Sequence, residues 1–87
     1  MKKNKNLKVS IVMGSQSDYK TMKLTCKILK KMGVKYETKI ISAHRTPKRM
    51  YEFARSAEKN SIGVIIAGAG GSAHLPGMIS ALTHIPV

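Results

Sequence analysis

The chain has 87 residues, of which 16 are lysine or arginine and four are aspartate or glutamate, so its formal net charge is +12. This length allows one small domain at most, and no apolar run of about 18 residues marks a membrane-spanning helix. The single cysteine, Cys26, excludes an internal disulfide framework and is typical of a cytoplasmic protein in a reducing compartment. We expect Cys26 to be a buried structural thiol, with a reactive thiol as the alternative.

The positive charge alone would suggest a nucleic-acid-binding module. It comes from 13 lysines and three arginines, and the four aromatic residues are not interleaved with them as base stacking would require. We therefore expect a solvated lysine face, an attraction for anionic substrates, and neither a nucleic-acid nor a membrane partner. The lysines expected on outer helix faces are Lys20, Lys23, Lys27, Lys30 and Lys31.

The first half of the chain predicts a strand, a helix and a second strand. Residues 8–13 are a short apolar run ending at Gly14, typical of a buried strand. Residues 18–32 should form a helix, with Ser17 or Asp18 as its N-cap and Gly33 as its stop. A second strand is expected over residues 35–41. The apolar positions at helical spacing are Tyr19, Met22, Cys26 and Leu29.

The second half repeats this alternation. Thr46 followed by Pro47 predicts a helix start, with threonine as the cap and proline at the first helical position. A third strand is expected over residues 62–67 and a third helix over residues 74–82, after which residues 83–87 turn toward a fourth strand that has barely begun. The second helix should bury Met50, Phe53, Ala54 and Ala57 and end at Asn60 and Ser61.

A β-α-β-α-β-α order predicts a parallel sheet with right-handed crossovers. The loops at the carboxyl ends of such strands form the ligand crevice. Here those loops are residues 14–18, 42–47 and 67–77, and together they supply small residues, hydroxyls, one carboxylate, one arginine and two histidines. This set suits a small phosphorylated substrate and proton-transfer chemistry.

Each loop has a functional interpretation and a purely structural one. Residues 14–18 could bind an anion through backbone N–H groups and serine hydroxyls, or could simply cap a helix. His44 beside Arg45 could pair a proton carrier with a phosphate clamp, or could be a loop histidine next to a helix cap. The glycines before His74 could let backbone amides approach a ligand, or could form a tight turn. His84 is interpreted as a surface or dipole-facing residue.

Taken together and in order, residues 12–18 (VMGSQSD), 42–47 (SAHRTP) and 67–78 (AGAGGSAHLPGM) resemble the N5-carboxyaminoimidazole ribonucleotide mutase family of purine biosynthesis. The resemblance extends from residue 8 to residue 87. Its last loop is more similar to the mutase class than to the class that carboxylates aminoimidazole ribonucleotide directly with CO2.

The resemblance implies a flavodoxin-like three-layer α/β/α sandwich with a parallel sheet, truncated after the third βα unit. Residues 1–87 would be the amino-terminal part of a single mutase domain, with a basic tail over residues 1–7. It implies a cytoplasmic homo-octamer for full-length members, with active sites near subunit contacts, and a reaction that needs no cofactor: no metal, ATP or biotin. An inactive remnant and a direct CO2-dependent carboxylase remain the alternatives.

The resemblance also assigns roles by matching position. His44 would be the general acid/base, and Asp18 would hold the ribose hydroxyls of the substrate. The segment from Gly70 through Gly71 to His74 would line the pocket for the carboxylate and CO2. The residues that would hold the ribose phosphate are Ser15, Ser17, Ser42 and Arg45.

Overall fold

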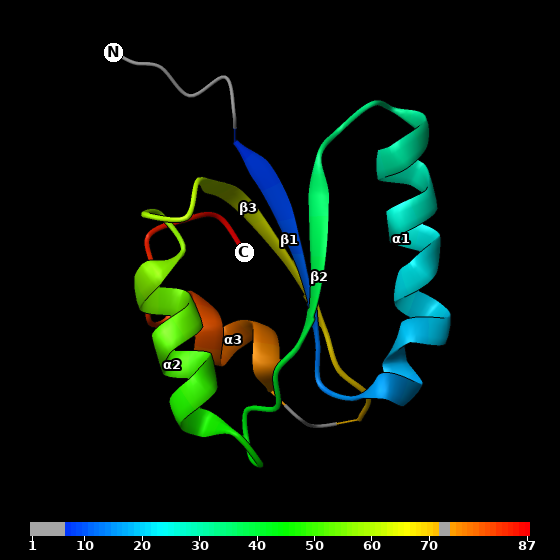
Figure 1. Ribbon diagram of the computed structural model, residues 1–87. Helices are drawn as coiled ribbons and strands as arrows, with labels where there is room; N and C mark the ends of the chain where they lie inside the picture. The colour runs from blue at the N-terminus through cyan, green and yellow to red at the C-terminus, as the bar shows by residue number, and fades with distance from the viewer. Residues whose placement is uncertain (1–6, 72–73) are drawn as a thin grey trace.

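A computed structural model describes residues 7–71 and 74–87. In this part of the chain, strands β1 (Lys8–Met13), β2 (Tyr36–Ile40) and β3 (Ile62–Gly68) form a parallel sheet in the order β2-β1-β3. Helix α1 (Tyr19–Lys31) follows a short 3-10 turn over Gln16–Asp18. Helices α2 (Pro47–Ser56) and α3 (Leu75–Ser80) complete the alternating order (Figure 1).

The sheet is the middle layer of a flavodoxin-like α/β/α sandwich, as predicted. Helix α1 covers one face, and α2 and α3 cover the other (Figure 1). Alternate residues of β1 pack on the two faces of the sheet, because successive side chains of a strand point to opposite sides. Ile11 and Met13 pack with Met22 and Cys26 under α1. The cluster on the other face includes Val12, Ile41, Met50, Phe53, Ala54, Ala57, Ile62, Ile65, Leu75, Ile79 and Ile85.

The predicted elements are confirmed, with changes at their ends. The first strand has its predicted bounds, whereas the second is one residue shorter at each end and the third extends to Gly68. The third helix begins at Leu75 rather than at His74, because His74 has a left-handed backbone with φ of 61°. It ends at Ser80, and residues 81–82 form a turn.

The residues after α3 return to the outer edge of β3. The backbone N–H of Ile65 donates a 2.9 Å hydrogen bond to the carbonyl oxygen of Pro86. This agrees with the expected turn toward a fourth strand, although residues 83–87 do not form a strand. The edge of β3 is therefore partly paired at its middle.

Predictions about individual side chains are also confirmed. Cys26 is 5% exposed, and the five lysines of α1 are all exposed. Basic tail residues 1–6 lie outside the described part of the chain. None of the described helices is long and apolar enough to cross a membrane.

A polar contact joins β1 to β2 within the sheet. The buried Ser10 hydroxyl donates to Glu37 Oε2 at 2.9 Å, and Lys8 Nζ lies 2.9 Å from Glu37 Oε1. Partial burial acts to raise the pKa of the Glu37 carboxyl. This effect is outweighed by the hydrogen bonds from Lys8 and Ser10 and by the charges of Lys8 and Lys39. The pKa of Glu37 therefore lies below its ordinary value of 4.5.

Candidate functional site

The register of the sheet brings the three predicted loops to one edge. Met13, the last residue of β1, lies opposite Ile40 of β2 and Gly68 of β3. Just beyond it, the N–H of Gly14 donates to the carbonyl oxygen of Gly68 at 3.3 Å. The chain therefore leaves the three strands at the same level, at the lower end of the sheet in Figure 1.

The first loop is held by the carboxylate of Asp18. Its Oδ2 accepts hydrogen bonds from the backbone N–H of Ser15 at 3.1 Å and from the Ser15 hydroxyl at 3.2 Å. The Oγ atoms of Ser15 and Ser17 are 2.8 Å apart, so one hydroxyl donates to the other. The two serines and the carboxylate thus form one cluster.

The expected N-cap of α1 needs a correction. Asp18 occupies the cap position, but its backbone is already helical and its side chain makes no capping bond to α1. The reason is the 3-10 turn over Gln16–Asp18, whose N-cap is Ser15 and which continues directly into α1. The Asp18 carboxylate turns back to Ser15 instead, as the acidic half of a capping box does.

The second loop is closed by hydrogen bonds between Ser42 and its neighbours. Ser42 Oγ accepts from the N–H of Arg45 at 3.0 Å, which leaves its own proton available for donation. Thr46 occupies the N-cap position of α2 and Pro47 the first turn, as predicted. However, the Thr46 hydroxyl makes no capping bond, because it donates to the Ser42 carbonyl and accepts from the Ser42 N–H, both at 3.0 Å.

The third loop passes close to the first at Gly14. A Cβ added at Gly14 would lie only 3.2 Å from the Cβ of Ala69, whereas one added at Gly70 would make an ordinary contact, 3.5 Å from Asp18 Oδ1. The glycine at position 14 therefore permits the close approach of the two loops. Residues 72–73, within the predicted CO2-pocket segment, lie outside the described residues.

Five of the nine predicted site residues line one hollow of about 230 Å³: Ser15, Ser17, Asp18, Ser42 and Gly70. Gly14, Ala43, Ala69 and Leu75 complete its lining. The hollow offers hydroxyl groups and one carboxylate over an apolar floor, a combination suited to a small polyhydroxylated ligand.

The other four predicted residues do not line this hollow, although each belongs to a loop that contributes to it. His44 and Arg45 are exposed in the second loop, and Arg45 lines a neighbouring hollow at the start of α2. Gly71 has a positive φ of 60° and is exposed, as is His74. The structure therefore gathers the serines, Asp18 and Gly70, but not the histidines, around the central hollow.

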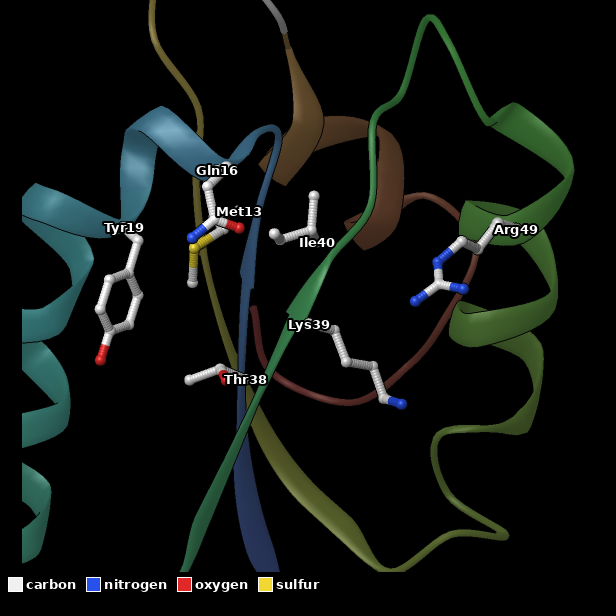
Figure 2. Close-up of a pocket in the computed structure, with 7 residues that line it drawn as sticks. All are labelled: Met13, Gln16, Tyr19, Thr38, Lys39, Ile40 and Arg49. Carbon is white, nitrogen blue, oxygen red and sulfur yellow. The ribbon is translucent and has the colours of Figure 1, made fainter.

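A second hollow, of about 510 Å³, was not predicted from the sequence. Figure 2 shows Lys39 from β2 and Arg49 from α2 extending into the space between these two elements, with Tyr19 beside Thr38 on the α1 side. No motif marks Lys39 or Arg49, because the two side chains come together only across separate elements. The positive charges of the half-buried Lys39 on β2 and the exposed Arg49 on α2 were the available signal. The lining residues are Met13, Gln16, Tyr19, Thr38, Lys39, Ile40 and Arg49.

His84 lies on the surface, as predicted. Its Nε2 is 3.1 Å from Glu58 Oε1, and both side chains are largely exposed. Glu58 follows the carboxyl end of α2, whereas the loop with His44 precedes the amino end of the same helix. His84 therefore belongs to the opposite end of the molecule from the candidate site.

Residues 8–87 match the AIR carboxylase family. The N5-carboxyaminoimidazole ribonucleotide mutase of Pyrococcus horikoshii is 60% identical over 87 residues, which are 100% of this chain and 49% of that protein. The mutase of Thermotoga maritima is 58% identical over 80 residues, 92% of this chain and 47% of that protein.

A match also occurs within a larger protein. The bifunctional purine synthesis protein purC/E of Dictyostelium discoideum is 57% identical over 79 residues, which are 91% of this chain and 8% of that protein. The chain thus spans about half the length of the mutases that it matches.

Proposed function

The chain belongs to the AIR carboxylase family, and from this premise we propose that it carries the substrate loops of an N5-carboxyaminoimidazole ribonucleotide mutase. That enzyme would be an isomerase of de novo purine (IMP) biosynthesis. Residues 1–87 would be the amino-terminal part of its single domain. The observation that supports this proposal most is that the three loops with the family's motifs start at the same edge of the sheet. The pairing of Met13 with Ile40 and Gly68 places them there.

The reaction moves a carboxyl group between two atoms of one substrate. The bond between N5 and the carboxyl carbon breaks, CO2 is released within the site, and the nitrogen gains a proton. Ring carbon C4 then bonds to that CO2 and loses its own proton, giving 4-carboxy-5-aminoimidazole ribonucleotide. One proton is supplied and one is recovered, so a single acid/base group can serve both steps.

We assign that group to His44. Imidazole can both donate and accept a proton near neutral pH. His44 lies one residue beyond Ala43, which lines the central hollow, and it is exposed to an incoming ligand. Arg45, next to it, would pair with the substrate phosphate through its guanidinium.

The roles that we assign to the remaining residues are based on the residues that line or border the central hollow. Ser15, Ser17 and Ser42 would donate hydroxyl hydrogen bonds to the phosphate, and Asp18 would accept from the ribose hydroxyls. The chain has 16 lysine and arginine residues against four acidic residues, so its positive potential favours an anionic substrate. Gly70, Gly71 and His74 would border the CO2, which must be retained until C4 attacks.

The test is conversion of the carbamate ribonucleotide to its C4-carboxy isomer, followed by ultraviolet absorbance on the purified 87-residue chain. His44→Asn should lower kcat by about 10²- to 10⁴-fold, the usual contribution of a general acid/base, with a small change in KM. His84→Asn is the matched control, because it removes an exposed histidine at the opposite end of the molecule. Equal activity in both variants would refute the role of His44.

Two further outcomes separate the alternatives. Turnover of aminoimidazole ribonucleotide with bicarbonate, and none of the carbamate, would identify the direct carboxylase. No turnover of either substrate by the chain, under conditions where a full-length relative is active, would mean that these loops need the rest of the domain. We further propose that the protein acts in the cytoplasm, in keeping with its unpaired Cys26 thiol.

A further inference from the structure

Two basic side chains from separate elements share the larger hollow at the edge of the sheet. Lys39 on β2 and Arg49 on α2 both line this hollow of about 510 Å³, and their charged ends extend into the same space (Figure 2). Both residues also line an adjoining hollow of about 220 Å³. Lys39 is half-buried and Arg49 is exposed, so the two positive charges face a space that small solutes can enter.

No carboxylate forms an ion pair with either cation in the part of the chain that the structure describes. Lys39 influences Glu37 through its charge, but the two Glu37 oxygens accept from a serine hydroxyl and from Lys8. Glu52 lines the adjoining hollow with both cations, yet it pairs with neither. Two cations that share a hollow without a paired counter-ion repel one another, and a bound anion would offset that repulsion.

The rest of the lining adds neutral hydrogen-bond donors. Gln16 has a side-chain amide, and Tyr19 and Thr38 have hydroxyls. The backbone of β2, which is an edge strand of the described sheet, adds another. The N–H of Ile41 donates to β1, and bonding alternates along a parallel strand, so the N–H of Ile40 faces the open edge. The hollow can therefore donate to an anion from side chains and from the main chain.

We propose that Lys39 and Arg49 form a binding site for the phosphate group of a small phosphorylated molecule, separate from the hollow of the proposed function. A guanidinium can bind two phosphate oxygens at once, and an ammonium adds a compact second charge. Together they match a phosphate monoester, whose charge is about −1.5 to −2 at pH 7, better than they match a carboxylate with a single charge. The volume of the hollow leaves room for the rest of such a molecule beside Tyr19.

The new site and the central hollow are adjacent but distinct. Gln16 lines the larger hollow, whereas its neighbours Ser15 and Ser17 line the central one. Arg45, which we assign to the substrate phosphate, lines neither of them. Phosphate bound at the two places must therefore be distinguished residue by residue.

The test is a titration of the isotope-labelled 87-residue chain with inorganic phosphate, followed through backbone N–H signals by NMR at constant ionic strength. We expect a saturable shift at Ile40. Lys39→Gln and Arg49→Gln should each weaken the binding measured there at least about tenfold, because each removes a charged hydrogen bond. Lys27→Gln is the matched control, since it removes the same charge from an exposed position of α1, and it should change the affinity less than about twofold. No saturable shift, or equal effects of Lys27→Gln and Lys39→Gln, would overturn the proposal.

Two more variants separate this site from the proposed substrate site. Arg45→Gln should leave the affinity measured at Ile40 within about threefold. Glu52→Gln removes the acidic group of the adjoining hollow, so it should tighten binding about two- to threefold. A tenfold loss in Arg45→Gln, or weaker binding in Glu52→Gln, would contradict a separate site at Lys39 and Arg49. The titration does not involve turnover, so an inactive chain would refute the proposed function without touching this result.

Discussion

Replacing Glu37 by glutamine tests the polar contact that joins β1 to β2. The carboxylate accepts from the Ser10 hydroxyl and from Lys8 Nζ, both at 2.9 Å. Glutamine has nearly the same shape and keeps one oxygen as an acceptor for Ser10. The substitution therefore removes the negative charge, while the hydroxyl of the fully buried Ser10 keeps a hydrogen-bond acceptor.

The expected loss of stability at pH 7 is about 1 kcal/mol. Solvent screening keeps the ion pair weak, because the Glu37 and Lys8 side chains are 23% and 34% exposed. A charged hydrogen bond contributes about 1.5–3 kcal/mol, and the retained amide acceptor offsets part of that loss. Glu37→Ala should cost roughly 1 kcal/mol more, because the buried Ser10 hydroxyl would then lose its acceptor.

The pH dependence has a definite sign. Since the pKa of Glu37 is below 4.5 in the folded chain, the carboxylate stabilises the fold above its unfolded pKa. That contribution disappears as pH falls through the lowered folded value. Urea unfolding at several pH values between 3 and 7 should show the wild type and Glu37→Gln converging at the acid end.

A difference between wild type and Glu37→Gln that is the same at pH 3 and at pH 7 would refute this reasoning. The loss would then come from packing or from the amide geometry, neither of which titrates. High salt provides an independent check at pH 7. It should reduce the difference, since the Lys8 contact is partly exposed.

Three further predictions concern two backbone positions and the thiol. Gly33 has φ of +75°, and the space that a Cβ would occupy there is open, so Gly33→Ala should cost about 1 kcal/mol in urea unfolding from backbone strain alone. Ser61, with φ of 64°, should give a small gain on replacement by glycine; a loss would contradict the strain argument. Cys26 is buried, so a thiol reagent should label it roughly 10²-fold faster in urea than in buffer, and equal rates would contradict its burial.

The strands and their alternation with helices could be predicted from the sequence because each signal was local. An apolar run ending at a small residue marks where β1 and β3 stop, and the alternation with helices requires a parallel sheet. The buried side of α1 followed from the spacing of Met22 and Cys26. These features depend on periodicity and burial, and the remainder of the fold does not change them.

The details at the loops could not be predicted, because they depend on competition between nearby hydrogen-bond partners. Asp18 and Thr46 both stand where a helix cap was expected. Each side chain instead bonds within its own loop, to Ser15 and to Ser42 respectively. Asp and Thr side chains have several local backbone partners at similar cost, and only the turn geometry selects one. The hollow beside Lys39 escaped prediction for a different reason, since it is created by packing between elements.

The arrangement of the candidate site depends on the sheet more than on the loops themselves. A parallel strand that slipped by one residue would turn its side chains to the opposite face and shift its loop along the edge. The register is instead fixed by burial of Ile11 and Met13 under α1 and of Val12 on the other face. The absence of a side chain at Gly14 then lets the first loop approach Ala69 of the third. The positions of the candidate site's loops are thus determined by apolar residues packed between the sheet and its helices.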